Sequence, residues 1–163
     1  TWTSHAPIAW TVGVAIAGAA WVLAPRGIPG RFIGIVWMMP LALLLPPPVA
    51  VGGAQVTVLD VGQGLAVFVA TATHALVYDT GPRFNDTVDA GGRIIVPFLR
   101  AAGVAKLDML VVSHADTDHS GGAGSLLRAV PVMTFLSSLL PDHPLAAQAA
   151  RTATVARCIA NTT

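Results

Sequence analysis

The chain has 163 residues, of which 54% are hydrophobic and only 10% are charged, and its formal net charge is +1. This composition is too apolar for a purely soluble globular protein, so we expect part of the chain to lie in a membrane. The sequence contains no block of basic residues of the kind that marks a nucleic-acid-binding surface.

Charged residues divide the chain into two parts. The first 50 residues carry only Arg26 and Arg31, whereas residues 51–163 carry seven Lys or Arg residues and all eight acidic residues, each of which is Asp. We therefore expect residues 1–50 to form one or two membrane segments and residues 51–163 to form a separate domain.

Two apolar runs make up the first part. Residues 8–24 form an uncharged run of 17 residues near the lower length limit of a membrane-spanning helix, with a buried soluble helix as the alternative. Residues 32–45 form a second run of 14 residues, which is short for a bilayer of about 30 Å. If both runs span, the positive-inside rule places the arginine loop at 25–31 in the cytoplasm and the remaining chain on the opposite side.

The second part begins after three prolines and alternates strand and helix signals. Glycine-rich turns and β-branched residues predict three short strands, and later apolar runs predict strands alternating with helices. The expected strands are 55–61, 65–70, 74–78, 107–113 and 132–136, and the expected helices are 94–102, 121–129 and 144–157. This order predicts a layered α/β arrangement.

A dense group of potential metal ligands follows the strand at 107–113. The group consists of His114, Asp116, Asp118 and His119. Residues two apart at the end of an extended segment point to the same side, so His114 and Asp116 are expected to bind one ion. Asp118 and His119 could serve a second ion nearby. Mixed imidazole and carboxylate ligands suit Zn²⁺ or Mn²⁺, and paired ions of this kind support phosphoryl displacement.

The residues around this group have simpler interpretations as well. Gly121 and Gly122 allow close approach of substrate or backbone and open a helix whose N-terminus favours an anion. The alternative for the whole stretch is a surface loop whose Asp and His side chains cap that helix. His143 is expected to be an ordinary loop residue, and Cys158 a small buried residue rather than a nucleophile.

The motif His-x-Asp-x-Asp-His resembles the central motif of the metallo-β-lactamase superfamily, where the second position is more often His. Together with residues 59–64 (LDVGQG), 78–82 (YDTGP) and 113–122, it resembles the C-terminal hydrolase-like domain of the ComEC family of DNA-internalisation competence proteins. The resemblance covers about residues 52–160. It implies a partial αββα sandwich over residues 51–163, preceded by one or two transmembrane helices at the end of a membrane channel region.

The resemblance also implies roles for single residues. His114 and Asp116 would bind the first metal ion, Asp118 and His119 would bind the second, and Asp118 would orient the nucleophilic water. Asp79 would hold one of these ligands in place.

Other motif positions have less defined roles. Asp60 and Gln63 would line the same sheet edge, with stabilisation of their own turn as an equal alternative. Leu65 stands where many relatives have Asp, so the site has one carboxylate fewer than in those relatives.

The family implies a multi-pass protein of the bacterial inner membrane, with residues after about 50 on the periplasmic or extracellular side. There the domain would degrade the DNA strand that is not transported. Its partners would be DNA, the membrane and other competence proteins, and no small-molecule cofactor is expected.

We expect the chain to be a fragment without the later ligands of the superfamily, and therefore to bind metal poorly and to be inactive alone. Two other functions stay open. One is a non-catalytic module that guides or gates DNA, and the other is a metallo-hydrolase acting on esters or lactams.

Overall fold

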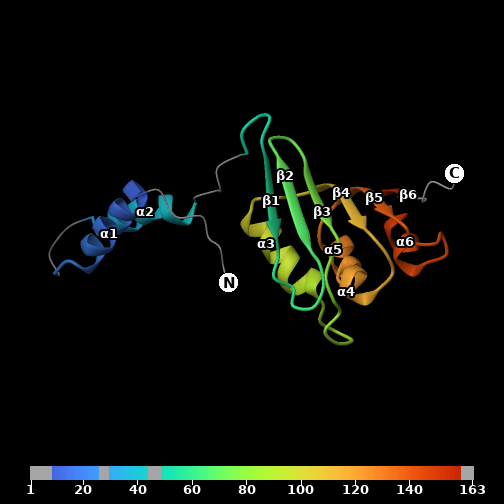
Figure 1. The fold of residues 1–163 in the computed structure, drawn as a ribbon. Coiled ribbons are helices and arrows are strands. Elements are labelled where there is room, and N and C mark those ends of the chain that lie inside the picture. Colours follow the sequence, from blue (N-terminus) through green and yellow to red (C-terminus); the bar gives the residue numbers. More distant parts are fainter. Residues whose placement is uncertain (1–8, 26–29, 44–48, 159–163) are drawn as a thin grey trace. The chain divides into compact units, whose positions relative to one another are not determined.

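The computed structural model describes residues 9–25, 30–43 and 49–158, and the chain divides into two compact units, Thr1–Pro47 and Pro48–Thr163 (Figure 1). Predictions that concern residues 1–8, 26–29, 44–48 and 159–163 lie outside the described residues. The predicted identity of the two units, membrane segments followed by a hydrolase-like domain, is not tested by this division and stays a prediction.

The first unit contains two helices at the positions of the two apolar runs. Helix α1 spans Ala9–Leu23 and helix α2 spans Phe32–Ala42, with Pro40 inside it. The backbones of the helices approach closely at Gly18 and Gly34, where an added Cβ atom on either residue would meet the carbonyl oxygen of the other. No helix in the described part of the chain is both long enough and apolar enough to cross a membrane.

The second unit is built on one six-stranded mixed sheet. Its strands lie side by side in chain order, from β1 at one edge to β6 at the other (Figure 1). The pairs β1–β2 and β2–β3 are antiparallel, whereas β3 to β6 run parallel to one another. The strands are β1 Ala54–Val58, β2 Val67–Thr71, β3 Ala75–Tyr78, β4 Leu107–Val112, β5 Val132–Ser137 and β6 Thr154–Arg157.

Short helices connect the parallel strands of this sheet. A π-helical turn at Gly91–Ile95 leads directly into α3, and two helices follow β4 before the chain enters β5. The helices are α3 Val96–Ala101, α4 Thr117–Ser120, α5 Ala123–Ala129 and α6 Pro144–Ala149.

One face of the sheet forms the core. Phe68, Val77, Leu110 and Phe135 are paired neighbours on four successive strands, and all four are buried. Apolar residues of the helices join them in a single cluster, so the helices cover this face. The largest helix contributions are Ile95, Leu99 and Leu126.

The opposite face of the sheet is apolar but is not fully buried. Its residues alternate with the core residues along each strand, because side chains of successive strand residues point to opposite faces. We call this surface the open sheet face, and it consists of Val56, Val58, Val67, Val69, Leu76, Tyr78, Met109, Val111, Thr134 and Leu136.

The predicted layered α/β arrangement of residues 51–163 is confirmed as a mixed sheet with helices, but several elements differ from the prediction. The helix predicted at 144–157 is wrong after Ala149, because Thr154–Arg157 pairs with β5 as a strand. The helix predicted at 121–129 begins only at Ala123, and a separate turn of helix, α4, precedes it. Cys158 is exposed, so its predicted burial is also wrong.

Candidate metal centre

The ligand-rich stretch lies at the end of β4. This strand ends at Val112 among parallel neighbours, and the chain leaves the sheet through residues 113–116 into α4. In open α/β sheets, binding sites lie outside the carboxyl ends of such strands. Asp116 occupies the N-cap position of α4, but within the described structure its side chain makes no capping hydrogen bond. Helix capping therefore does not account for this carboxylate.

Three of the predicted ligands come together here. His114, Asp118 and His119 each offer one ligand atom, and these atoms lie within 4.8 Å of one another. The two imidazole rings have centroids 4.2 Å apart, and Nε2 of His119 lies 3.4 Å from Oδ2 of Asp118. We call these three residues the His–His–Asp cluster.

Asp116 lies beside this cluster rather than in it. Its Oδ2 atom is 3.3 Å from Nε2 of His114, but its side chain is 75% exposed against 51% for Asp118. The cluster thus combines one member of the first predicted ligand pair with both members of the second. The predicted division of the four ligands between two ions stays a prediction.

Asp79 is hydrogen-bonded to His119 and so helps to orient the cluster. It follows β3, is completely buried, and has a positive φ of 56°, a conformation that Asp and Asn tolerate better than most residues. Its carboxylate accepts hydrogen bonds from the backbone N–H of Ser113 at 2.7 Å and from Nδ1 of His119 at 2.8 Å. A carboxylate oxygen has no proton to donate, so Nδ1 of His119 carries a proton, and in the neutral imidazole Nε2 has the lone pair that a metal ion needs.

Backbone contacts from two other motifs hold α4. The carbonyl of His119 accepts hydrogen bonds from the N–H of Thr80 at 2.7 Å and from its hydroxyl at 2.9 Å. The carbonyl of Asp118 accepts one from the N–H of Leu65 at 3.2 Å. Gly64 has a φ of 142° and lies so close to Asp118 that a Cβ atom would collide with this carbonyl. The sequences LDVGQG and YDTGP therefore position the ligand-bearing turn.

The remaining predicted site residues lie in a turn or pack closely against the backbone. Asp60 accepts a hydrogen bond from the N–H of Gly62 at 3.3 Å, as a turn-stabilising Asp does, and Gln63 is exposed in the same turn. Gly121 packs against the backbone of residues 82 and 83, and Gly122 against the backbone of residues 80 and 91. A side chain at either glycine would collide with those backbones, so the pair allows close approach of the chain to itself.

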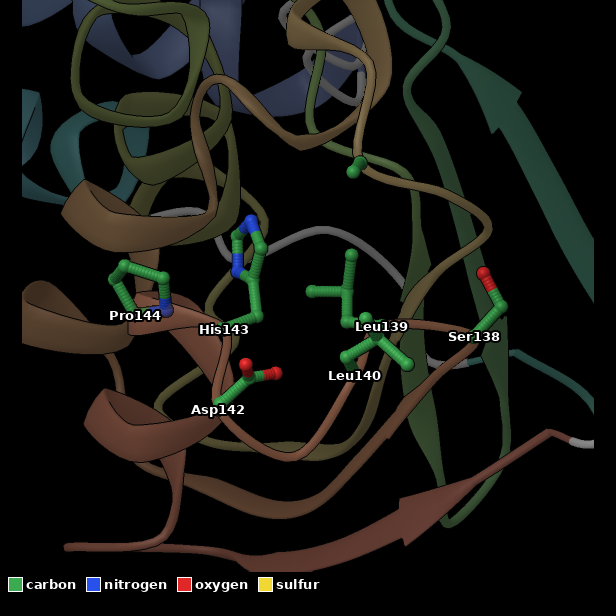
Figure 2. Close-up of a pocket in the computed structure, with 7 residues that line it drawn as sticks. Ser138, Leu139, Leu140, Asp142, His143 and Pro144 are labelled. Carbon is green, nitrogen blue, oxygen red and sulfur yellow. The ribbon is translucent and has the colours of Figure 1, made fainter.

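An open pocket adjoins the loop that carries His114. Its volume is about 420 Å³, and its lining residues are Ala115, Ser138, Leu139, Leu140, Asp142, His143 and Pro144. Figure 2 shows His143 and the two leucines around this space. Nδ1 of His143 accepts a hydrogen bond from the N–H of Leu145 at 3.2 Å, so this histidine caps α6. The pocket is large enough to hold part of a substrate beside the cluster.

The donor set of the cluster fits a divalent ion. Bonds of about 2.0–2.1 Å in a tetrahedral arrangement place neighbouring ligand atoms about 3.3–3.4 Å apart. Within the cluster, the contact between His119 and Asp118 has this length, and all three ligand atoms lie within 4.8 Å of one another. Two imidazoles with one carboxylate leave a fourth position open, which is typical of catalytic rather than structural zinc sites.

Sequence reasoning assigned no role of their own to Ser113 and Thr80. In the sequence, Ser113 directly precedes His114 and Thr80 directly follows Asp79, and this adjacency is the signal that points to them. Their contacts reach across 34 and 39 positions of the chain, and local spacing contains no information on them.

This chain is similar in sequence to several known proteins. The pattern of the Metallo-beta-lactamase superfamily matches residues 59–155. The chain is 44% identical to Competence protein ComA of Neisseria gonorrhoeae over 109 residues, which cover 67% of this chain and 15% of that protein. It is 41% identical to Recombination protein 2 of Haemophilus influenzae over 87 residues, which cover 51% of this chain and 10% of that protein. It is 34% identical to Ribonuclease J of Mycolicibacterium smegmatis over 113 residues, which cover 66% of this chain and 18% of that protein. The chain thus spans less than a fifth of the length of each.

Proposed function

The chain belongs to the metallo-β-lactamase superfamily, and from this membership we propose that it is the metal-dependent hydrolase part of a DNA-uptake protein, acting on the phosphodiester backbone of DNA. The resemblance to competence proteins that the motifs predicted is confirmed. The single observation that carries the proposal is the His–His–Asp cluster at the carboxyl end of β4. A relative named Ribonuclease J supports a nucleic-acid phosphodiester as the substrate.

His114, His119 and Asp118 would hold the ion, which we propose to be Zn²⁺ or Mn²⁺. A bound divalent ion would supply Lewis acidity toward a phosphate ester. We propose a second ion as well, with Asp116 among its ligands.

The side chains of the site have separate tasks in this proposal. Asp79 keeps the proton of His119 on Nδ1 and therefore keeps Nε2 available. Asp118 is half exposed, so an oxygen of its carboxylate is accessible to an attacking water, which it orients and whose proton it accepts. The pocket beside Ala115 would seat the part of the DNA strand that flanks the cleaved bond.

We also propose that the first unit belongs to a membrane segment of a multi-pass protein of the bacterial inner membrane. Helices α1 and α2 carry no charged residue, and large apolar side chains such as Ile16, Phe32 and Val36 are more than half exposed. Helices that are apolar all round are found in lipid or in the core of a larger assembly. Residues after about 50 would then lie on the periplasmic or extracellular side, in contact with DNA and other competence proteins.

The open sheet face supports the predicted αββα sandwich. It presents a nearly continuous apolar surface on the side of the sheet that the helices do not cover. A sheet with one apolar face of this size is stable when a second layer packs against it. We propose that a second β-sheet of the αββα arrangement supplies this layer.

The test is DNA uptake and strand degradation in cells that carry the protein with His114→Ala or Asp118→Ala. Both variants are expected to lose degradation of the non-transported strand, whereas His74→Ala, an exposed histidine outside the cluster and the pocket, retains it. Unchanged degradation in the His114→Ala cells contradicts the enzymatic proposal.

The purified chain with Zn²⁺ or Mn²⁺ and labelled single-stranded DNA separates the other functions. Metal-independent binding of DNA without cleavage favours a guiding or gating module. Turnover of an ester or lactam with intact DNA favours a different metallo-hydrolase. This assay also checks the expectation that the chain is inactive alone.

A further inference from the structure

Ser113 contacts the supporting carboxylate and a ligand at the same time. Its hydroxyl donates a hydrogen bond to Oδ2 of Asp79 at 2.8 Å. The hydroxyl oxygen of Ser113 also lies 2.8 Å from Nδ1 of His114. Its backbone N–H donates to Oδ1 of Asp79 at 2.7 Å. Its carbonyl also accepts a hydrogen bond from the hydroxyl of Ser138. The residue is therefore fixed through its N–H, its carbonyl and its hydroxyl.

The number of available protons decides which atoms donate in these hydrogen bonds. A serine hydroxyl has one proton and two acceptor lone pairs, and the carboxylate of Asp79 only accepts. The single proton of Ser113 is used in the bond to Asp79, so toward His114 the hydroxyl oxygen acts as an acceptor. Nδ1 of His114 must then carry the proton and donate it to Ser113. In the neutral imidazole Nε2 of His114 then has the lone pair, and this atom faces Oδ2 of Asp116 at 3.3 Å.

We propose that Ser113 is a positioning residue that relays the carboxylate of Asp79 to His114 and so fixes this histidine as the Nδ1–H tautomer. Asp79 fixes the tautomer of His119 directly and that of His114 through Ser113. One buried carboxylate thereby turns the Nε2 lone pairs of both histidines toward one cation. The relation of Ser113 to the metal rests on the proposed metal centre, whereas the tautomer of His114 does not.

The surroundings of Asp79 make this relay specific. The side chain is completely buried, and its two oxygens accept from the N–H of Ser113, the hydroxyl of Ser113 and Nδ1 of His119. Within the described residues, every buried side-chain nitrogen or oxygen has a hydrogen-bond partner. Removal of the Ser113 hydroxyl therefore leaves Nδ1 of His114 without its acceptor.

The test compares Ser113→Ala, Ser113→Thr and Ser120→Ala in the ¹⁵N-labelled chain without metal. Ser120→Ala is the matched control, because the Ser120 hydroxyl is buried next to His119 but donates to the carbonyl of Ala115 and contacts no imidazole. Long-range ¹H–¹⁵N correlation spectra report which nitrogen of His114 carries the proton. Ser113→Ala is expected to lose the Nδ1–H form, while Ser113→Thr, which retains a hydroxyl, and Ser120→Ala keep it.

Zinc titration of the same proteins gives the second measurement. Loss of a residue that orients a metal-bound histidine typically lowers the affinity 10–100-fold, and we expect about this loss for Ser113→Ala alone. The inference is overturned if His114 in Ser113→Ala keeps its proton on Nδ1. It is also overturned if the wild-type chain binds zinc and Ser113→Ala binds it as tightly as Ser120→Ala does.

Two further outcomes are distinguishable. If the wild-type chain binds no zinc but His114 shows the serine-dependent Nδ1–H form, the metal centre fails and the relay holds. If Ser113→Ala does not fold, Ser113→Cys, which keeps the size but has a weaker acceptor, is expected to show the same change of tautomer. An unchanged tautomer in Ser113→Cys then contradicts the relay.

Discussion

The Oδ2 atom of Asp79 lies 2.8 Å from Nδ1 of His119, although the two residues are 40 positions apart in the sequence. The contact joins the residue after β3 to the last turn before α5, so it fixes the ligand-bearing segment to the sheet. Because Asp79 is completely buried and His119 reaches the surface, the pair connects the core of the domain to its candidate site.

We expect Asp79→Asn to lower the free energy of unfolding by about 3 kcal/mol, since hydrogen bonds to a charged group contribute about 1.5–3 kcal/mol each and several are weakened together. Asn tolerates the positive φ of this position as Asp does, so backbone strain does not contribute. Urea denaturation of the wild type and the variant measures the difference. Asp108→Asn is the control, because its carboxylate accepts one bond from the N–H of Ala75, which an amide oxygen also accepts. Equal stability of Asp79→Asn and Asp108→Asn would show that the buried network contributes little.

Asp118 and Asp116 are expected to differ in their effect on zinc affinity. Asp118 lies in the His–His–Asp cluster, whereas the side chain of Asp116 is more exposed and lies beside His114, outside the cluster. Asp118→Ala should lower the affinity at least 100-fold, more than is typical for residues that merely orient a ligand, and Asp116→Ala should lower it less. Isothermal titration calorimetry with Zn²⁺ gives both values. A larger loss in Asp116→Ala would assign the ion to the predicted pair of His114 and Asp116 instead.

Gly122→Ala and Gly124→Ala test the close packing behind the site. A Cβ atom on Gly122 would collide with the backbones of Gly91 and Thr80, which cannot move without displacing the motif around Asp79. Gly124, inside α5, has no neighbour closer than 3.5 Å to an added Cβ atom. We expect Gly122→Ala to destabilise the chain by more than about 2 kcal/mol.

Gly124→Ala, by contrast, should be neutral or stabilising by up to about 1 kcal/mol, because alanine favours the helix. Thermal unfolding by circular dichroism compares the two variants. Similar melting temperatures would mean that the backbones near Gly122 yield easily.

Binding of zinc is expected to stabilise the chain against unfolding. An ion that binds the folded state alone raises the free energy of unfolding by about 2.7 kcal/mol at 100 times its dissociation constant. Differential scanning calorimetry with Zn²⁺, and again after addition of a chelator, measures the shift. The shift should disappear in His119→Ala and persist in His74→Ala, whose imidazole contacts the neighbouring Thr73. A shift of equal size in His119→Ala would place the bound ion elsewhere.

Most of the fold could be predicted because strands β2 to β5 are mostly apolar runs bounded by turns. The last strand could not. Residues 144–157 are rich in alanine, which favours a helix locally, but Thr154–Arg157 has a partner in β5 that only the folded sheet supplies. The early end of the helix at Ala149 is thus a tertiary effect.

The candidate ligands could be found from the sequence because they are neighbours along the chain. Their orientation could not, since it depends on contacts from Asp79, Thr80 and Leu65, which lie far away in the sequence. The functional roles of His114, Asp116, Asp118 and His119 stay predictions until metal binding is measured.

The N–H groups of Leu65 and Thr80 donate to the carbonyls of Asp118 and His119, so the ligand-bearing turn is held in place only in the folded chain. A peptide of residues 113–122 would carry all four ligand side chains without the groups that aim them. Two loops, of about 50 and about 40 residues, have to close before the turn is held in place, and closure of such loops costs entropy that only the assembled sheet repays. An ion bound with native affinity would therefore report that the tertiary structure is complete.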